Sequence, residues 1–264
     1  MHSNVDLLVK LNIQSLLKEP VSVLICMLIR DERTTEKTKT NALVRDYDDA
    51  LEDLDEFNII IVPGGNYETV LQKKLQPLAL IKAFVELQKK DPSKERTIMS
   101  VSTGSFFLAA QGALQGLAAT THPDYYTKFE NLCQDAARRG DLEQTDVMEE
   151  RYVVCNARFE LGENEQANPF IFRKRPAPLA QGRKSSARKG SFAFQEAASR
   201  ESVLRRSNLK LGGLRVITAG GISAGLDASL YLVGAMVSHE SAEEVARVTQ
   251  YQWSKGVVVD GLDV

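Results

Sequence analysis

The residues best placed to do chemistry in this sequence are Ser102, Thr103 and Gly104. An apolar run over 97–101 precedes them and an Ala-, Leu- and Phe-rich segment follows, so the pattern predicts a strand, a tight turn and a helix. Such a turn places Ser102 beside the first free N–H groups of the helix, which attract negative charge. The arrangement is typical of a nucleophile elbow, although Ser100 stands where the first glycine of the usual motif would be. The alternative is a serine that only caps a helix.

Two further turns carry paired glycines at the ends of apolar runs. The run over 57–62 ends in Gly64-Gly65, and the run over 214–218 ends in Gly220-Gly221. Paired glycines let a backbone pass close to another group, although each pair is also compatible with a turn and nothing more. Because sites in open α/β sheets lie outside the carboxyl ends of the strands, we expect these two turns to converge with the turn at Ser102.

Strands and helices alternate along the chain, which predicts the α/β class: a doubly wound, mostly parallel sheet with helices on both faces. The expected strands are 21–29, 57–62, 97–101, 117–121, 152–156, 214–218 and an edge strand at 257–260. The expected helices are 4–17, 66–90, the segment after the elbow, 124–138, 222–238 and 240–253, with a loop at 30–42 and an exposed acidic stretch at 46–55.

Composition narrows the class of protein. The 264 residues are 43% hydrophobic with a net charge of −2, enough for one well-buried domain over 1–264 with an insertion and with no overall preference for polyanions. No apolar run is long enough to span a bilayer and no signal peptide opens the chain, so we expect a cytoplasmic protein. Scattered cysteines and histidines argue against disulfides, a metal site or a metal cofactor. These residues are Cys26, Cys133, Cys155, His2, His122 and His239.

A basic segment interrupts the pattern at about 173–210. It holds eleven Lys or Arg against two Glu, a local charge of +9, and small polar residues fill the gaps. Such a composition predicts a flexible insertion, with a short helix near 193–206. Basic segments can bind nucleic acid, but the only interleaved aromatic residues are Phe192 and Phe194. We therefore favour a solvated loop and expect no nucleic-acid or membrane partner.

Taken together these features resemble the ThiJ/PfpI superfamily, which has a class I glutamine-amidotransferase-like, flavodoxin-like fold. The likeness is greatest to its isocyanide-hydratase branch with its fungal relatives. The likeness spans 46–253 apart from the basic insertion. The matching pieces are 46–50 (DYDDA), 61–65 (IVPGG), 100–104 (SVSTG), 119–122 (ATTH) and 218–229 (TAGGISAGLDAS).

The resemblance implies a site. Ser102 stands where the family carries its nucleophilic cysteine, with Thr103 beside it. Backbone N–H groups of Gly64, Gly65 and Thr103 would hold developing negative charge. The turn 220–222 (Gly220, Gly221 and Ile222) would line the substrate. A serine hydroxyl is a much weaker acid than a thiol, so Ser102 needs a general base.

Two further residues are candidates for proton transfer. The family has an acidic residue after its first strand, and Val5-Asp6-Leu7-Leu8 can be matched to that segment, which implies that the first strand here is shortened or missing. Asp6 would then orient water or accept a proton; its alternative is a surface N-cap. His122 lies near the pocket in relatives, but a histidine before Pro123 is equally compatible with a structural role.

Three functions follow from the resemblance. The first is a small-molecule hydratase or lyase, in which Ser102 donates a hydrogen bond and forms no covalent intermediate. The second is a catalytically silent ligand-binding or interaction protein of the same fold. The third, a deglycase-like redox or repair role, depends on an elbow cysteine and ranks lowest. We expect a small-molecule substrate, no cofactor and a homodimer.

Overall fold

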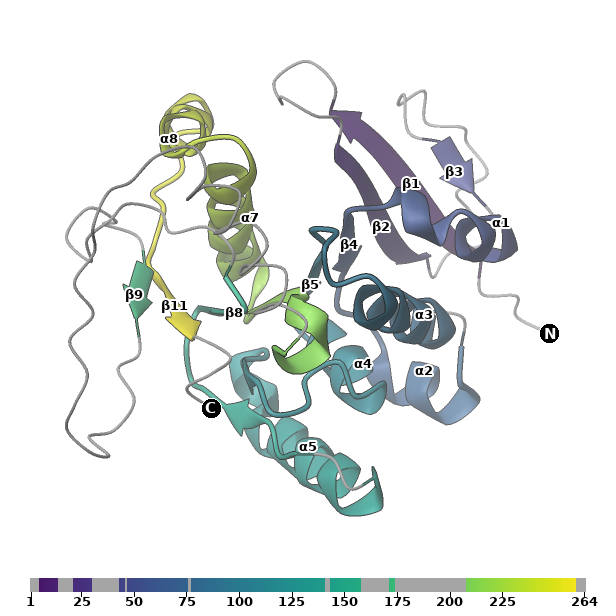
Figure 1. The fold of residues 1–264 in the computed structure, drawn as a ribbon. Helices are drawn as coiled ribbons and strands as arrows, with labels where there is room; N and C mark the ends of the chain where they lie inside the picture. The colour runs from purple at the N-terminus through teal and green to yellow at the C-terminus, as the bar shows by residue number, and fades with distance from the viewer. Residues whose placement is uncertain are drawn as a thin grey trace.

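The computed structural model places most of the chain in an α/β fold with one large sheet (Figure 1). The residues that it describes are 5–13, 21–29, 43–45, 47–75, 77–140, 143–157, 171–173 and 208–259. Within them, nine strands form a sheet in the order β3-β1-β2-β4-β5-β10-β8-β11-β9. The strands are β1 Val5–Ile13, β2 Val21–Ile29, β3 Leu43–Arg45, β4 Ile59–Val62, β5 Thr97–Val101, β8 Tyr152–Cys155, β9 Ile171–Arg173, β10 Arg215–Ala219 and β11 Gly256–Val259.

Parallel pairing dominates the centre of the sheet. Strands β2, β4, β5 and β10 run parallel to one another. Strand β8 is antiparallel to β10, while β11 is parallel to both β8 and β9. The mostly parallel α/β sheet predicted from the sequence is confirmed, and it brings the carboxyl ends of β4, β5 and β10 to one edge.

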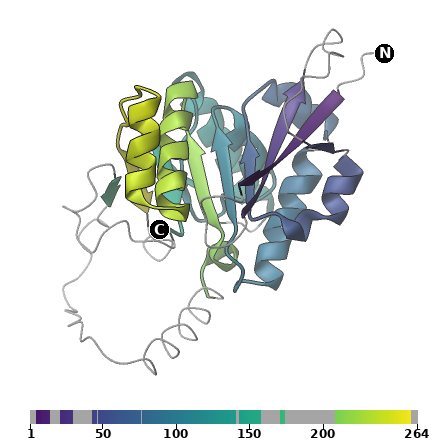
Figure 2. The same ribbon diagram turned by 90° about the horizontal axis from the view of Figure 1, so that it is seen from above.

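Helices cover both faces of the sheet, as Figure 2 shows from above. Alternate side chains of each central strand enter opposite layers: Ile98 and Val216 pack with α3, α4 and α5, whereas Met99 and Ile217 pack with α7 and α8. Burial on both faces explains why these strands read as continuous apolar runs. The helices are α1 Tyr47–Glu52, α2 Tyr67–Lys73, α3 Pro77–Lys90, α4 Gly104–Ala110, α5 Tyr126–Gly140, α7 Ile222–Met236 and α8 His239–Val248.

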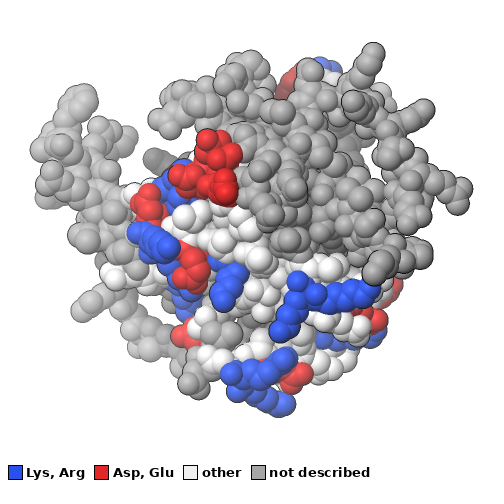
Figure 3. Space-filling model, turned by 90° about the vertical axis from the view of Figure 1, so that its right-hand side faces the viewer, with Lys and Arg blue, Asp and Glu red and all other residues white. Residues whose placement is uncertain are grey.

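The outer surface of the layer that holds α3 is polar. Lys82, Glu86, Lys89 and Lys90 are exposed on that helix, and Lys89 pairs with Glu86 at 3.0 Å. On the side of the molecule drawn in Figure 3, basic and acidic side chains of the described residues lie interspersed. Among the helices that the structure describes, none is long and apolar enough to cross a membrane.

The N-terminal segment corrects one prediction. The expected helix over 4–17 is wrong, because residues 5–13 form β1, which pairs antiparallel with β2 and β3. Their apolar residues also follow a two-residue period, which suits a strand. The expected gap at the first strand is filled, since β2 lies between β1 and β4 and pairs with both.

Other boundaries differ in smaller ways. The helix expected over 66–90 is two helices, because Lys74 ends α2 with φ 49° and Pro77 begins α3. The last strand, expected at an edge, lies inside the sheet between β8 and β9. The strand expected over 117–121 is shorter than predicted. It is the two-residue β6 Ala118–Ala119, which pairs with β7 Asp146–Val147.

The basic segment and the loop at 30–42 lie outside the described residues, except for the two ends of the basic segment. Arg173 ends β9, and Lys210 begins the 3₁₀ turn Lys210–Gly213. Lys210 pairs with Glu143 at 2.6 Å and donates to the carbonyl of Gly116 at 2.8 Å. The C-terminal end of the predicted insertion is therefore packed against the body.

Candidate functional site

Ser102 occupies a strained turn between β5 and α4. Its φ of 56° lies in the left-handed region, which residues other than glycine rarely adopt. Three contacts hold this backbone: its N–H donates to the carbonyl of Ala219 at 2.8 Å, and its carbonyl accepts from Thr121 Oγ1 at 3.2 Å and Ser105 Oγ at 3.1 Å. The predicted elbow is present, and neighbouring elements maintain its strain.

The double-glycine turn after β4 packs directly against the elbow. A Cβ on Gly64 would lie 2.9 Å from Ser102 Cβ and 3.0 Å from the backbone nitrogen of Thr103. The hydroxyl of Thr103 is engaged with Gly65, since it accepts from the Gly65 N–H and donates to the Gly65 carbonyl, both at 3.0 Å. Thr103 therefore links this turn to the start of α4.

The third turn, after β10, reaches the same place. Ala219 bonds to Ser102, and a Cβ on Gly220 would lie 3.3 Å from the carbonyl oxygen of Thr121. A Cβ on Gly221 would lie 4.0 Å from His122 Cδ2. The expected convergence of the three turns is thus observed, at the carboxyl edge of β4, β5 and β10.

Not every N–H group in these turns is free to bind a ligand. The N–H of Gly65 donates to Thr103 Oγ1, and the N–H of Gly220 donates to the carbonyl of Arg151 at 2.9 Å. Within the described residues, no hydrogen bond engages the N–H of Gly64, Thr103 or Gly221, or the hydroxyl of Ser102. The unengaged N–H groups and the Ser102 hydroxyl are the donors that a bound molecule could use.

His122 lies at the rim of the site and is half-exposed. Its Nδ1 accepts a hydrogen bond from the backbone N–H of Asp124 at 3.3 Å, which leaves Nε2 to carry the proton of the neutral ring. Its ring meets Tyr125 edge-on, with centroids 5.8 Å apart. Tyr125 in turn contacts Tyr67 and Phe106, so an aromatic wall continues from His122 over α4.

The remaining predicted residues lie at different distances from the elbow. Ile222 begins α7 directly after the glycine pair and is 85% exposed. Asp6 lies on β1 opposite Leu28, and β2 and β4 separate β1 from β5. At about 4.8 Å between neighbouring strands, Asp6 is roughly 14 Å from β5 across the sheet. The structure therefore brings Ser102, Thr103, the glycine turns and His122 together but does not bring Asp6 to them.

Sequence reasoning assigned no role to three residues that hold this site. Thr121 bonds to the carbonyl of Ser102, Arg151 bonds to Gly220, and Asp227 is fully buried on α7. The sequence feature that could have revealed them is Asp227, a charged residue within a helix otherwise rich in small apolar residues. A carboxylate in such a helix requires a buried partner.

Neither Cys133 nor Cys155 stands at the elbow, which gives a testable expectation. Cys133 and Cys155 are buried, and burial raises the pKa of the Cys133 thiol to about 11. Because thiolates are the reactive form, iodoacetamide should label both residues slowly in the folded protein and quickly after denaturation. Mass spectrometry of the alkylated protein measures this; rapid native labelling of Cys133 accompanied by inactivation would contradict the assignment of the site to Ser102.

Comparison with known proteins places the chain in a family. Among solved structures, it is similar to a ThiJ/PfpI family protein from Pseudomonas syringae, with 17% identity, a TM-score of 0.39, and coverage of 74% of this chain and 50% of that one. It is also similar to Drosophila melanogaster DJ-1beta, with 12% identity, a TM-score of 0.41, and coverage of 80% and 74%. This chain thus spans about half the length of the Pseudomonas protein.

No curated protein matches the sequence. The family model described as DJ-1/PfpI family matches residues 21–157, which include β4, the elbow and β8. This match covers more than half of the chain, and it contains Ser102 and the turns that meet it from β4 and β6. The chain belongs to the DJ-1/PfpI family.

Proposed function

We propose that this protein is a small-molecule hydratase of the lyase type, similar to isocyanide hydratases, in which Ser102 takes the place of the family's nucleophilic cysteine. The observation that carries the proposal is the φ of 56° at Ser102. A non-glycine residue in this region costs about 1–3 kcal/mol and persists where surrounding structure enforces it, as at many active sites. At Ser102 the contacts with Ala219, Thr121 and Ser105 hold this conformation at the point where the three turns meet.

The proposed reaction adds water to a small, polarisable triple bond. For an isocyanide, the water oxygen bonds to the terminal carbon, one proton ends on that carbon and the other on nitrogen, giving a formamide. Ser102 stays neutral, because a serine does not ionise at neutral pH without a base. Its hydroxyl donates a hydrogen bond to the substrate or to the attacking water. The N–H groups of Gly64, Thr103 and Gly221, which have no partner among the described residues, stabilise the negative charge that develops.

The alternative function is a catalytically silent, ligand-binding protein. The observation that favours it is that no described side chain hydrogen-bonds the Ser102 hydroxyl, together with the separation of β1 from β5 by β2 and β4. The same N–H groups would then bind a polar ligand without turning it over.

A substrate screen separates the two functions. Purified protein is incubated with a panel of isocyanides, nitriles and activated alkenes, and the hydrated products are measured by mass spectrometry. We expect turnover of at least one compound by the wild type and its loss in Ser102→Ala. Saturable binding without product, by calorimetry on the same panel, would support the silent alternative and overturn the enzyme proposal.

A further inference from the structure

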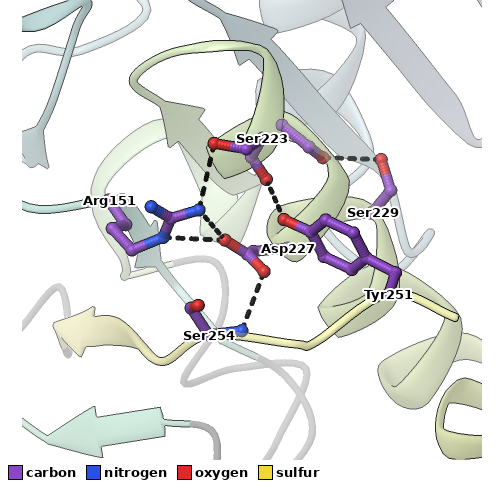
Figure 4. Close-up of polar contacts among 7 residues, drawn as sticks. Arg151, Ser223, Asp227, Ser229, Tyr251 and Ser254 are labelled. Atoms are coloured by element: carbon purple, nitrogen blue, oxygen red, sulfur yellow. Dashed lines mark hydrogen bonds and ion pairs between the residues drawn. The ribbon is translucent and has the colours of Figure 1, made fainter. Parts of the chain in front are cut away.

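A buried carboxylate lies behind the turn that contacts Ser102. Asp227 on α7 is 0% exposed, and its Oδ1 accepts from the backbone N–H of Ser254 at 2.8 Å. Its Oδ2 accepts from both Nε, at 2.8 Å, and Nη2 of Arg151 (Figure 4). This hydrogen bonding raises the pKa of Arg151 above its ordinary value. The carboxylate is therefore fully occupied in holding Arg151 and the segment after α8.

Arg151 holds the turn after β10 from both of its sides. Its carbonyl accepts the N–H of Gly220 at 2.9 Å, at the end of β10. Its Nη2 also donates to Ser223 Oγ at 3.2 Å, in the first turn of α7. The carbonyl of Ser223 accepts from Tyr251 Oη at 2.7 Å, which adds a second restraint on the same helical turn. The residues between these anchors are Gly221 and Ile222.

We propose that Arg151 and Asp227 are positioning residues that hold Gly221 and its N–H group in place behind Ser102. The proposal rests on the proposed function for its catalytic consequence, but the restraint itself is a property of the fold. The path is short: Arg151 fixes Gly220 and Ser223, and Ala219, next to Gly220, accepts the N–H of Ser102. A change at Arg151 reaches the elbow through this one turn.

The geometry requires arginine rather than any cation. A guanidinium presents Nε and Nη2 to one carboxylate oxygen and still reaches Ser223, whereas an ammonium is a single point charge. Removing the guanidinium also leaves a fully buried carboxylate without its cationic partner, which favours rearrangement of the start of α7. Arg151→Lys should therefore behave like Arg151→Gln rather than like the wild type.

The first experiment needs no substrate. Backbone amide exchange is followed by NMR in the wild type, Arg151→Gln, Arg151→Lys and Asp227→Asn. We expect exchange at Gly220 and Gly225, whose N–H groups donate to the carbonyls of Arg151 and Gly221, to accelerate roughly tenfold in all three variants, because a local restraint is lost while the rest of the fold keeps its protection. In the Arg151→Gln/Asp227→Asn double variant the effects should not add, because the two residues form one interaction.

The second experiment places a reporter at the elbow. In a Ser102→Cys background, the thiol pKa is measured from the pH dependence of iodoacetamide alkylation. We expect Arg151→Gln and Arg151→Lys to raise this thiol pKa alike, since both release the Gly221 turn. A rise in Arg151→Gln alone would mean that only the charge of Arg151 matters, and would overturn the positioning role.

Arg247→Gln is the matched control. Arg247 on α8 also binds a carboxylate through Nε and Nη2, both at 2.7 Å to Glu244, but has no described contact with the turn after β10. It should leave the exchange at Gly220 and Gly225 and the reporter pKa unchanged. Unchanged exchange and thiol pKa in the Arg151 variants would refute the proposal; altered values with no substrate found would retain it and count only against the proposed hydratase.

Discussion

Replacing Ser102 with alanine is expected to lower the rate of water addition about 100-fold or more, the typical cost of removing one donor from a site that stabilises developing charge. The substitution removes the hydroxyl oxygen of Ser102, which forms no hydrogen bond with a described residue. All the backbone contacts of the elbow stay in place. The Tm should therefore hardly change. Initial rates with the best substrate of the screen, and a thermal unfolding curve, measure both effects.

Ser102→Cys completes this prediction. The cysteine of the family is restored at a position where free N–H groups favour a thiolate, so the variant should keep or exceed the wild-type rate and should react with iodoacetamide. Ser93→Ala is the control, because Ser93 is an exposed serine whose described bonds go to Asp91. Full activity of Ser102→Ala would show that the hydroxyl plays no part in the reaction.

The α/β class and the place of the site follow from local patterns in the sequence. Central strands such as β5 and β10 are buried on both faces and so appear as short apolar runs. The turn after β4 shows why a glycine is needed there: a Cβ added at Gly64 would lie 2.9 Å from Ser102 Cβ. These requirements are local, and a sequence records them directly.

The segment over 5–13 shows why other parts could not be predicted. Apolar residues stand at every second position of this segment, at Val5, Leu7, Val9, Leu11 and Ile13. A different choice among its apolar residues also fits the spacing of a helix. Pairing with β2 decides between the two, and that pairing is a contact between distant segments that short-range periodicity does not contain. The same holds for Arg151 and Asp227, which are 76 residues apart.

The second large effect is expected at Gly104, the first residue of α4. A Cβ at this position would lie closer than 3.0 Å to the carbonyl oxygen of Val62, at the end of β4, and 3.1 Å from that of Pro63. Both obstacles are backbone atoms, which cannot rotate away as a flexible side chain can. Gly104→Ala must therefore displace α4 from β4, and with it Ser102 and Thr103.

We expect Gly104→Ala to lower the free energy of unfolding by about 3 kcal/mol, the upper end of the usual cost of overpacking. For a chain of this size that corresponds to a fall in Tm of roughly 6–12 °C. Differential scanning calorimetry measures it, and substrate turnover at a temperature where the variant is folded should also fall, because the elbow moves with α4.

Gly221→Ala is the control that distinguishes the steric clash at position 104 from the effect of replacing a glycine by alanine in general. Its φ of −93° suits alanine, and the nearest atom to an added Cβ, His122 Cδ2, lies 4.0 Å away, which is ordinary contact. Gly221→Ala should therefore unfold within about 2 °C of the wild type, as expected for a substitution without overpacking or strain. If both variants lost the same stability, close packing of α4 on β4 would not be the reason for glycine at position 104.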